Sequence, residues 1–405
     1  MTLKVVHLNA SSSGGAFQVA QRLNIALNEQ TGVQSNHLVF TGKNSSAYTL
    51  WSNSWFRRKR SFFLHALEKL DFLRFEKSSD VRFSYSHAKT GISILNNRLV
   101  KEADIVHLHW INKGFLSLDG LRDLLKSDKK IIWTAHDMWP FTGGCYYSGS
   151  CKNYLNNCAN CKYLKNPNMT LSTKMLAQKK QIFEHSSIKF ITPSQWLKSI
   201  GEASIPGLNV TQVYNGINTD LFKPNLGGNG GANFTVAFAA ASLADKRKGL
   251  VDFMKIIPEL HKEIPHLKIL FIGNQSPDLK VPDAIDVEFT GFISDETAMK
   301  DLYNRSDVYV NTSHEDNLPT TIMESLSCGT PVFSYGVGGV IEMVSSDRGG
   351  LVDDGDYKGL AKKIISYHNL GKDEQNKLGL NARKFALANF DIEEVARLHL
   401  EVYKA

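Results

Sequence analysis

The stretch "DVYVNTSHEDNLPTTIMESLSCGTPVFSYG", residues 307–336, predicts a strand, a helix and a second strand in that order. Its two ends are short apolar runs of the kind that form buried parallel strands. Between them, Pro319 suits the first position of a helix, and Gly329 followed by Pro331 marks its end. The stretch therefore predicts one strand–helix–strand unit of an α/β fold.

The same alternation of apolar runs and helical patterns recurs along the whole chain. Two sets of runs are separated by a Gly/Asn-rich stretch at 225–233, which predicts a loop. The sequence thus predicts two Rossmann-like domains, 1–205 and 206–387, with ligands bound in a cleft between their sheets. The runs are 3–10, 103–110, 129–137 and 188–194 in the first set, and 234–240, 267–273, 286–291, 307–313 and 330–336 in the second.

Composition and charge limit the class of protein further. The chain has 405 residues, of which 42% are hydrophobic, and this is enough for two domains with cores of their own. A formal charge of +7 suits phosphate-bearing substrates or an anionic membrane surface and does not require nucleic acid as a partner. The sequence begins on a strand-like run without a signal-peptide pattern, and no apolar run approaches the ~20 residues of a membrane span. We expect a cytoplasmic protein.

Two acids, Asp316 and Glu324, flank the start of the predicted helix. The first backbone N–H groups of a helix have no internal partner and its dipole is positive there, so a phosphate would bind at Thr320 and Thr321. Glu324 stands about 6 Å along the axis from Thr320, and a carboxylate so close to a diphosphate would repel it. Both acids are therefore expected to accept hydrogen bonds from hydroxyl groups. Taken alone, such a segment is more often an ordinary capped helix with a solvated glutamate.

Several segments carry a resemblance to a known enzyme family. "NGINTDLFKP" (215–224), the stretch 291–339 and "GLVDDGD" (350–356) look like parts of the retaining glycosyltransferases of GT-B architecture, of the family 4 type. The acid pair resembles that family's E-x7-E motif, with Asp316 in the position of the first Glu. "AHDMWPFTGGCYYSGSCKNYLNNCANC" (135–161) is similar to the colanic-acid-type branch of bacterial surface-polysaccharide transferases. The resemblance covers nearly the whole chain.

The resemblance implies a fold, an activity and a role for each domain. Domain 1–205 would bind the acceptor, domain 206–387 the nucleotide-sugar donor, and a C-terminal helix at about 388–405 would pack back on the first domain. The implied activity is retaining transfer of a sugar from a nucleotide diphosphate to a saccharide acceptor, lipid-linked in related enzymes, in cell-surface polysaccharide synthesis. A sugar-nucleotide epimerase of the same fold and a non-enzymatic sugar-nucleotide-binding module are the alternatives.

Sugar transfer leaves negative charge on the departing β-phosphate, and the resemblance indicates which residues stabilise it. The family has an Arg where this chain has Ser242, but Lys248 keeps the position of the family Lys. Lys246 or Arg247 could supply the missing cation, and the scheme requires no metal or other cofactor. The implied catalytic residues are His136, Lys248, Asp316 and Glu324. The implied donor-binding residues are Gly14, Gly15, Lys246, Arg247, Lys248, Phe292, Asn317, Leu318, Pro319, Thr320, Thr321 and Glu324.

His136 stands at the end of a strand-like run and would face the cleft. By resemblance it would hydrogen-bond the transferred sugar or the acceptor. A role as general base is not required if the leaving phosphate takes the acceptor proton. On the residues alone, a single histidine is more often a structural hydrogen-bonding residue. His107 and His109 alternate along a strand and are expected to pack or to line the cleft rather than to bind a metal.

Four of the five cysteines fall close together, at Cys145, Cys151, Cys158 and Cys161, spaced C-x5-C-x6-C-x2-C. Four thiolates in so short a segment could hold a structural zinc ion, and the C-x2-C pair fits that interpretation. Disulfides are the alternative interpretation, but a reducing cytoplasm argues against them. Reduced thiols are a third alternative. Cys328 is separate and is expected in the core.

Residues 55–75, "WFRRKRSFFLHALEKLDFLRF", combine a cationic run at Arg57 to Arg60 with many aromatic and leucine residues. Such a segment can lie on an anionic membrane, where it would bring a lipid-linked acceptor to the enzyme. The alternative is an amphipathic core helix with a basic, solvated face. The sequence does not decide between the two.

Overall fold

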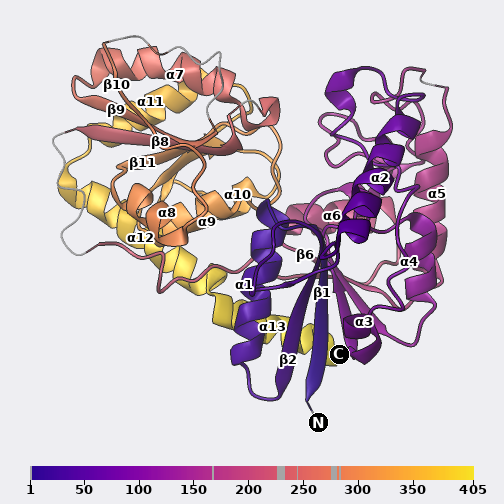
Figure 1. Ribbon diagram of the computed structural model, residues 1–405. Coiled ribbons are helices and arrows are strands. Elements are labelled where there is room, and N and C mark those ends of the chain that lie inside the picture. Colours follow the sequence, from indigo (N-terminus) through magenta and orange to yellow (C-terminus); the bar gives the residue numbers. More distant parts are fainter. Residues whose placement is uncertain (1, 167, 226–232, 244, 275–280, 282–283) are drawn as a thin grey trace. The chain divides into compact units, whose positions relative to one another are not determined.

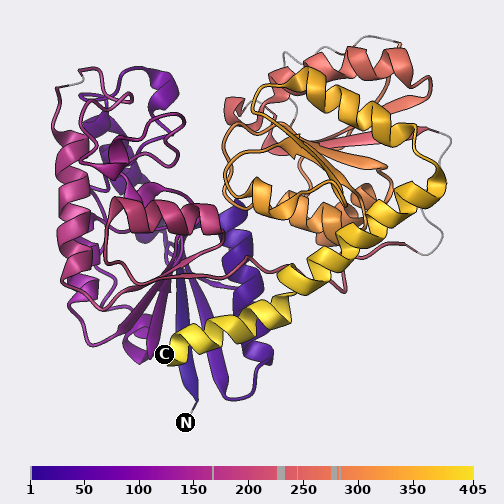
Figure 2. The same cartoon turned by 180° about the vertical axis from the view of Figure 1, so that it is seen from behind.

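The computed structural model describes the chain except for residues 1, 167, 226–232, 244, 275–280 and 282–283. The chain forms two units, each built around one parallel sheet (Figures 1 and 2). Unit 1 comprises Met1–Tyr214 and Val395–Ala405, and unit 2 comprises Asn215–Glu394. The loop expected at 225–233 lies almost wholly outside the described residues.

Unit 1, in its described residues, holds a seven-stranded sheet in the order β3-β2-β1-β4-β5-β6-β7, with every neighbouring pair parallel. The central strands are buried because helices cover the sheet, as near-continuous apolar runs require. Leu8 on β1 and Val106 on β4, for example, have no exposed surface. The strands are β1 (Leu3–Ser11), β2 (Val33–Thr41), β3 (Thr49–Leu50), β4 (Ile105–Leu108), β5 (Lys130–Thr134), β6 (Lys189–Thr192) and β7 (Val210–Gln212).

The helices of unit 1 include one from the C-terminal end of the chain. α13 (Ile392–Lys404) lies against the strands of unit 1 in Figure 2, and the Tyr403 hydroxyl is 2.6 Å from His107 Nδ1. Asp391 separates α13 from α12, so the helix expected at about 388–405 is the end of one helix followed by another. The others are α1 (Gly15–Glu29), α2 (Trp55–Phe72), α3 (Arg98–Glu102), α4 (Leu118–Leu125), α5 (Leu171–Glu184) and α6 (Gln195–Ser204).

Unit 2, as far as it is described, contains a six-stranded parallel sheet in the order β10-β9-β8-β11-β12-β13. Figures 1 and 2 show α7 and α11 on one side of this sheet and α8, α9 and α12 on the other. The strands are β8 (Phe234–Ser242), β9 (Leu267–Asn274), β10 (Asp286–Phe289), β11 (Val308–Asn311), β12 (Val332–Tyr335) and β13 (Gly349–Val352). The helices are α7 (Leu250–Glu263), α8 (Glu296–Asn304), α9 (Thr320–Ser327), α10 (Val340–Met343), α11 (Tyr357–His368) and α12 (Lys372–Phe390).

Each sheet has one topological switch point, where successive strands leave to opposite sides. In unit 1 it lies between β1 and β4, and in unit 2 between β8 and β11. Ligands of open parallel sheets bind outside the carboxyl ends of the strands at such points. In unit 2 the loops at this edge are those that follow β8 and β11, and they carry the predicted donor residues 246–248 and 317–319.

The helix of the opening stretch differs from its prediction by one residue. Pro319 is the N-cap of α9 and Thr320 is its first residue, because Pro319 has an extended ψ of 123° rather than a helical one. The predicted end is confirmed, since Gly329 follows the helix with φ of 75°, a conformation that favours glycine. Every apolar run predicted as a strand is a strand.

Candidate active site

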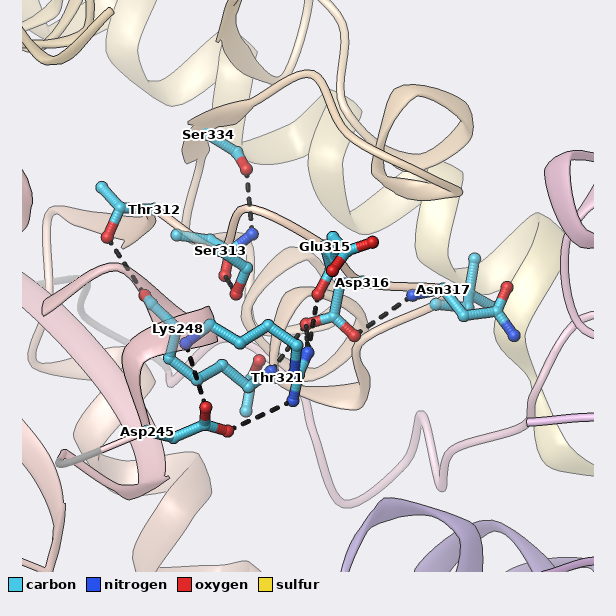
Figure 3. Close-up of polar contacts among 12 residues, drawn as sticks. Asp245, Lys248, Thr312, Ser313, Glu315, Asp316, Asn317, Thr321 and Ser334 are labelled. Atoms are coloured by element: carbon cyan, nitrogen blue, oxygen red, sulfur yellow. Dashed lines mark hydrogen bonds and ion pairs between the residues drawn. The ribbon is translucent and has the colours of Figure 1, made fainter. Parts of the chain in front are cut away.

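Lys248 and Asp316 form the centre of the candidate site in unit 2 (Figure 3). Lys248 ends a short 3-10 helix, Lys246–Lys248, in the loop after β8, and Asp316 lies in the loop between β11 and α9. The Lys248 ammonium is 2.6 Å from Asp316 Oδ2. The two residues were both predicted as catalytic, and the fold brings them together across the switch point as an ion pair.

Asp316 is a buried carboxylate that two cations surround. Burial by itself raises the pKa of Asp316, but the charges of Lys248 and then Arg247, with a hydrogen bond from Lys248, outweigh it and leave the pKa below its usual range. The backbone N–H of Asn317 also donates to Asp316 Oδ1 at 3.2 Å. Asp316 is therefore ionised at neutral pH and neutralises part of the positive charge of this loop.

Two glycines allow these loops to approach one another so closely. Gly249, which follows Lys248, has φ of 69°, and a Cβ there would collide with the carbonyl oxygen of Thr312. Gly338 has φ of 54°, and a Cβ there would collide with the carbonyl oxygen of Asp316. A side chain at either position would therefore push the loops apart.

Arg247, rather than Lys246, shares the carboxylate with Lys248. Its guanidinium lies 3.6 Å from Asp316 Oδ2 and donates to the Glu315 carbonyl oxygen at 2.6 Å. It also lies 3.4 Å from Asp245 Oδ2, while Lys246 is exposed. Of the two residues that could replace the missing family Arg, the geometry favours Arg247.

α9 and the loop before it hold most of the other predicted donor residues of unit 2. Thr321 Oγ1 is 3.0 Å from the Tyr309 hydroxyl, and Glu324 accepts a hydrogen bond from the Tyr303 hydroxyl at 3.1 Å. Glu324 is buried, with 6% of its surface exposed, so the alternative of a solvated glutamate is wrong. Among the other predicted donor residues, Asn317 and Leu318 are buried, Thr320 is half-buried, and Phe292 is exposed.

The sequence reasoning missed Tyr303 and Tyr309. Tyr303 lies on α8 and is completely buried, and burial and the nearby Glu324 raise its pKa, so that it stays protonated and donates to that carboxylate. Tyr309 lies on β11, where it was counted only as part of an apolar run. No motif marks either tyrosine, since each acts through a residue of α9 that lies elsewhere in the sequence.

Three predicted site residues lie in unit 1, at the carboxyl ends of its strands. Gly14 precedes α1 with φ of 91°, and neither Gly14 nor Gly15 has an atom near the position of a Cβ, so the backbone there is open. His136 follows β5 and is half-buried, with its Nε2 3.0 Å from Nδ1 of His109. Burial, with a smaller effect of His399, lowers the pKa of His136 to about 3, so its imidazole is neutral near pH 7.

The four clustered cysteines line one small cavity, and none forms a disulfide. Burial raises the pKa of Cys145 to about 12 and that of Cys158 to about 11, so both are thiols without a metal. Across the described residues, ligand atoms of three or more His, Cys, Asp or Glu side chains lie within 4.8 Å of one another at His7, His107 and His109 and not at the cysteines. The sulfur atoms are thus near one another but not assembled into a tetrahedron. Cys328 is buried, as expected.

Lys179 is buried beside this cavity, with no exposed surface. Its ammonium donates to the carbonyl oxygens of Trp139 at 2.5 Å and Thr142 at 3.0 Å. Burial lowers the pKa of Lys179 to about 7, against the opposing influence of the Cys145 and Cys158 sulfurs. A lysine that titrates near neutral pH therefore lies in the interior next to the cysteines.

Most apolar side chains of α2 are exposed, but Phe72 is buried and Leu64 packs against the core of unit 1. Among its 18 residues Ser61, Glu68 and Phe72 are buried, so α2 contacts the unit along one narrow face, and both interpretations of the segment stay open. The exposed apolar residues of α2 are Trp55, Phe56, Phe62, Phe63, Leu67 and Leu70. Arg57, Arg58, Lys59 and Arg60 are exposed beside them. Among the described residues, no helix combines the length and the apolar character that crossing a membrane requires.

A family model described as "Glycosyl transferases group 1" matches residues 234–369, which lie in unit 2. WcaC of Escherichia coli K12, named for a glycosyl transferase of colanic acid biosynthesis, is 25% identical over 259 residues, covering 62% of this chain and 63% of WcaC. The match thus spans less than two thirds of that relative. The prediction of a glycosyltransferase agrees with the family match over residues 234–369.

Solved structures resemble the chain over almost its whole length. Sucrose-phosphate synthase from Thermosynechococcus elongatus has a TM-score of 0.69 at 17% identity, over 99% of this chain and 98% of that one. Anabaena HepE in complex with UDP and glucose has a TM-score of 0.66 at 15% identity, over 100% of both chains. These likenesses concern the fold and confirm the predicted GT-B class. The chain thus carries the GT-B fold, and its residues 234–369 match the group 1 glycosyl transferases.

Proposed function

We propose that this protein transfers a sugar, with retention of configuration, from a nucleotide diphosphate to a saccharide acceptor in cell-surface polysaccharide synthesis. The observation that carries the proposal is the cluster of Lys248, Arg247 and Asp316 at the switch point of unit 2, beside the start of α9. Cations and free helix N–H groups together suit a diphosphate. A neighbouring carboxylate suits the sugar hydroxyls of the same donor.

The main task of catalysis in this reaction is to stabilise the phosphate leaving group. The bond between the anomeric carbon and the β-phosphate oxygen breaks, and its electron pair goes to the phosphate. The acceptor oxygen bonds to the anomeric carbon on the same face, and the acceptor proton passes to the leaving phosphate. Lys248 and Arg247 would stabilise the charge that develops on the phosphate. Glu324, held by Tyr303, would accept hydrogen bonds from the donor ribose.

The decisive experiment incubates the protein with UDP-, GDP- and dTDP-sugars and measures nucleotide release with and without saccharide acceptors. UDP-sugars come first, because a structural neighbour holds UDP. Release that depends on an acceptor supports transfer, whereas an epimerase converts the donor without one and a binding module does neither. The anomeric coupling constants of the product, measured by NMR, test retention. A product with inverted configuration would overturn the proposed stereochemistry.

The acceptor of this transferase is, in our proposal, lipid-linked and presented at the inner face of a membrane. Support comes from α2, where exposed aromatic residues such as Phe62 and Phe63 adjoin the cationic run Arg57 to Arg60. Exposed rings can enter the region between headgroups and acyl chains, and the cations can pair with anionic headgroups.

Vesicle sedimentation tests this surface. The protein should bind vesicles rich in phosphatidylglycerol much more strongly than phosphatidylcholine vesicles, and less strongly as salt is raised. Phe62→Ser with Phe63→Ser should abolish binding. Leu380→Ser provides the matched control, since Leu380 is 71% exposed on α12 and Phe62 is 73% exposed. Equal binding of the double variant and the control would refute the role of α2.

We also propose that the cysteine cavity holds a structural zinc ion. Four sulfur ligands around one cavity fit zinc in number and kind, and the buried Lys179 would offset the net negative charge of a four-thiolate site. In a tetrahedral site with about 2.3 Å bonds, the sulfurs lie about 3.8 Å apart, so binding would draw them together. Such an ion would stiffen the loop that follows His136.

Metal analysis tests the zinc site. Purified protein should retain about one equivalent of zinc through dialysis, with four thiols protected until a chelator is added. Cys161→Ser should lose the metal, whereas Cys328→Ala, which leaves the cavity intact, should keep it. Metal-free protein with four freely reactive thiols would end the hypothesis.

A further inference from the structure

Three histidines of unit 1 form a continuous hydrogen-bonded chain that ends at His136, one of the predicted site residues. His7 lies on β1, His109 directly follows β4, and His136 follows β5, so the chain crosses three adjacent strands. His7 Nδ1 is 2.9 Å from His109 Nε2, and His109 Nδ1 is 3.0 Å from His136 Nε2. Parallel pairing of β1 with β4 and of β4 with β5 produces this alignment.

All three imidazoles are neutral. Burial, reinforced by the neighbouring histidines, lowers the pKa of His7 and of His109 well below the ordinary value, and burial lowers that of His136 to about 3. A neutral imidazole carries one N–H and one bare nitrogen. Each hydrogen bond in the chain therefore fixes which nitrogen of the next ring carries the proton. The protons of the three rings have only two possible arrangements, all directed inward or all directed outward.

The buried end of the chain distinguishes these arrangements. His7 Nε2 is buried and has no hydrogen-bond partner among the described residues. If the protons point inward, Nε2 becomes an unpaired N–H in the interior. If they point outward, it is an unpaired acceptor, and among buried backbone groups orphaned N–H donors are rarer than under-satisfied acceptors. The outward arrangement leaves His136 with its Nε2 accepting from His109 and its proton on Nδ1.

A buried metal ion is the competing explanation, because ligand atoms of His7, His107 and His109 lie within 4.8 Å of one another. The contacts of His107 argue against it. His107 Nδ1 is 2.6 Å from the Tyr403 hydroxyl, and its Nε2 is 2.8 Å from Thr134 Oγ1. Both nitrogens of His109 also have imidazole partners. A metal would break these bonds without a carboxylate to balance its charge.

We propose that His109 and His7 are positioning residues that hold His136 in the neutral tautomer with its proton on Nδ1. In this form His136 donates a hydrogen bond to an uncharged oxygen of the sugar or the acceptor. It does not serve as a base, because the incoming proton would meet a nitrogen that already carries one. The part that concerns catalysis rests on the proposed sugar transfer, whereas the tautomer itself does not.

The tautomer is read directly by ¹⁵N NMR of the whole protein labelled in its histidines, with His136 assigned by its loss in His136→Asn. We expect Nδ1 of His136 to have the shift of a protonated ring nitrogen and Nε2 that of a bare one. The reverse assignment would overturn the proposal even if the protein transfers sugar. The expected assignment would support it even if no donor is turned over.

Two variants at position 109 separate positioning from packing. His109→Asn places its amide near the former Nδ1 and can still donate to His136, whereas His109→Gln reaches toward His7 instead. The Gln variant should disturb the His136 tautomer and lower kcat roughly tenfold, as loss of one hydrogen bond implies. The Asn variant should keep the tautomer and most of kcat. Equal effects of the two variants would show that His109 acts only through packing.

His37→Asn is the matched control. His37 is buried in the same sheet, and its Nδ1 is 2.7 Å from Gln21 Oε1, but it lies outside the chain of three histidines. Thermal unfolding identifies any variant that loses activity through instability. The control should leave the His136 signals unchanged, and a control that shifts them as much as His109→Gln would refute the specific chain. A bound metal equivalent that His107→Gln releases, with the cysteine cavity intact, would also overturn it.

Discussion

Replacing Asp316 by Asn should change donor binding and turnover in opposite directions. The substitution keeps the shape of the side chain and removes its charge, so Lys248 and Arg247 lose their shared carboxylate. In the proposed reaction, a donor diphosphate would compete with Asp316 for the same cations. Loss of the Asp316 charge should therefore tighten the binding of the nucleoside diphosphate alone, although the proposed reaction uses the carboxylate.

The magnitude follows from the geometry of the pair. Two unit charges 2.6 Å apart attract by about 6 kcal/mol at an effective dielectric of about 20. Lost hydration and solvent screening offset most of this, because 22% of the Lys248 side chain remains exposed, and hydrogen bonds to charged groups contribute about 1.5–3 kcal/mol net. Asn can still accept a weaker hydrogen bond. We therefore expect a gain of about 1–2 kcal/mol, or roughly 5- to 30-fold in Kd.

Turnover of Asp316→Asn should fall because the donor sugar, in the proposed reaction, would lose its hydrogen bond to the Asp316 carboxylate. A lost charge-assisted hydrogen bond of about 1.5–3 kcal/mol corresponds to roughly 10- to 150-fold in kcat. Calorimetry with UDP, GDP and dTDP measures the first effect, and donor turnover measures the second. Glu315→Gln is the control, since it changes the charge equally one residue away. Unchanged or weaker diphosphate binding in Asp316→Asn would refute the competition for Lys248.

Three further predictions follow from the same contacts. Lys248→Ala should lower kcat by more than it raises the donor KM, since the leaving group gains charge in the transition state; Arg247→Ala should show a smaller effect and Lys246→Ala none. Intact turnover in Lys248→Ala would overturn the leaving-group mechanism. Glu324→Gln should weaken donor binding by about 1–3 kcal/mol in calorimetry, and unchanged affinity would refute its ribose contact. Because burial lowers the pKa of His136 to about 3, only the unfolded chain binds its proton near pH 6, so the stability from this residue is full above about pH 6.5 and falls below it. Urea unfolding at pH 7.5 and 5.5 should differ by about 1.4 kcal/mol per buried histidine of this kind.

The strands that were not predicted show why a search for apolar runs does not find every strand. β2 (Val33–Thr41) is buried, but its first half contains Ser35 and His37. Ser35 Oγ donates to Asn24 Oδ1 at 2.8 Å, and His37 bonds to Gln21 on the same neighbouring helix. These polar side chains are satisfied by partners that an apolar count ignores. A strand stabilised in this way does not stand out in its sequence.

Some features of the candidate site are determined by residues close in sequence, and others by contacts between residues far apart in sequence. The helix at Thr320, the acids on either side of its start and the caps are set by neighbours in the chain, and the sequence predicted them to within a residue. The pairing of Lys248 with Asp316 joins residues 68 positions apart and depends on the strand order. The residue types predicted a cation and an acid near the donor. Only the fold shows that each is the other's partner.

α2 illustrates a different limit, because periodicity does not tell which face of a helix is covered. Its hydrophobic residues suit a core as well as a membrane, and the sequence left both open. The structure shows which residues of this helix are buried, namely Ser61, Glu68 and Phe72, two of which are polar. Glu68 accepts from Ser86 Oγ at 2.5 Å and from the Gly114 N–H at 3.1 Å, so a buried polar contact helps to hold the helix while aromatic residues such as Phe62 and Phe63 stay exposed.

The two units offer opposite kinds of chemistry at the carboxyl ends of their strands. At its switch point unit 2 presents Lys248 and Arg247, whose charges suit an anionic diphosphate. At the carboxyl end of β5, one strand away from its own switch point, unit 1 presents His136 at the end of a chain of imidazoles that burial keeps neutral. A neutral imidazole gains little from a phosphate but can hydrogen-bond an uncharged hydroxyl. In the proposed reaction the donor's phosphates would therefore bind unit 2, and unit 1 would bind sugar hydroxyls and the acceptor.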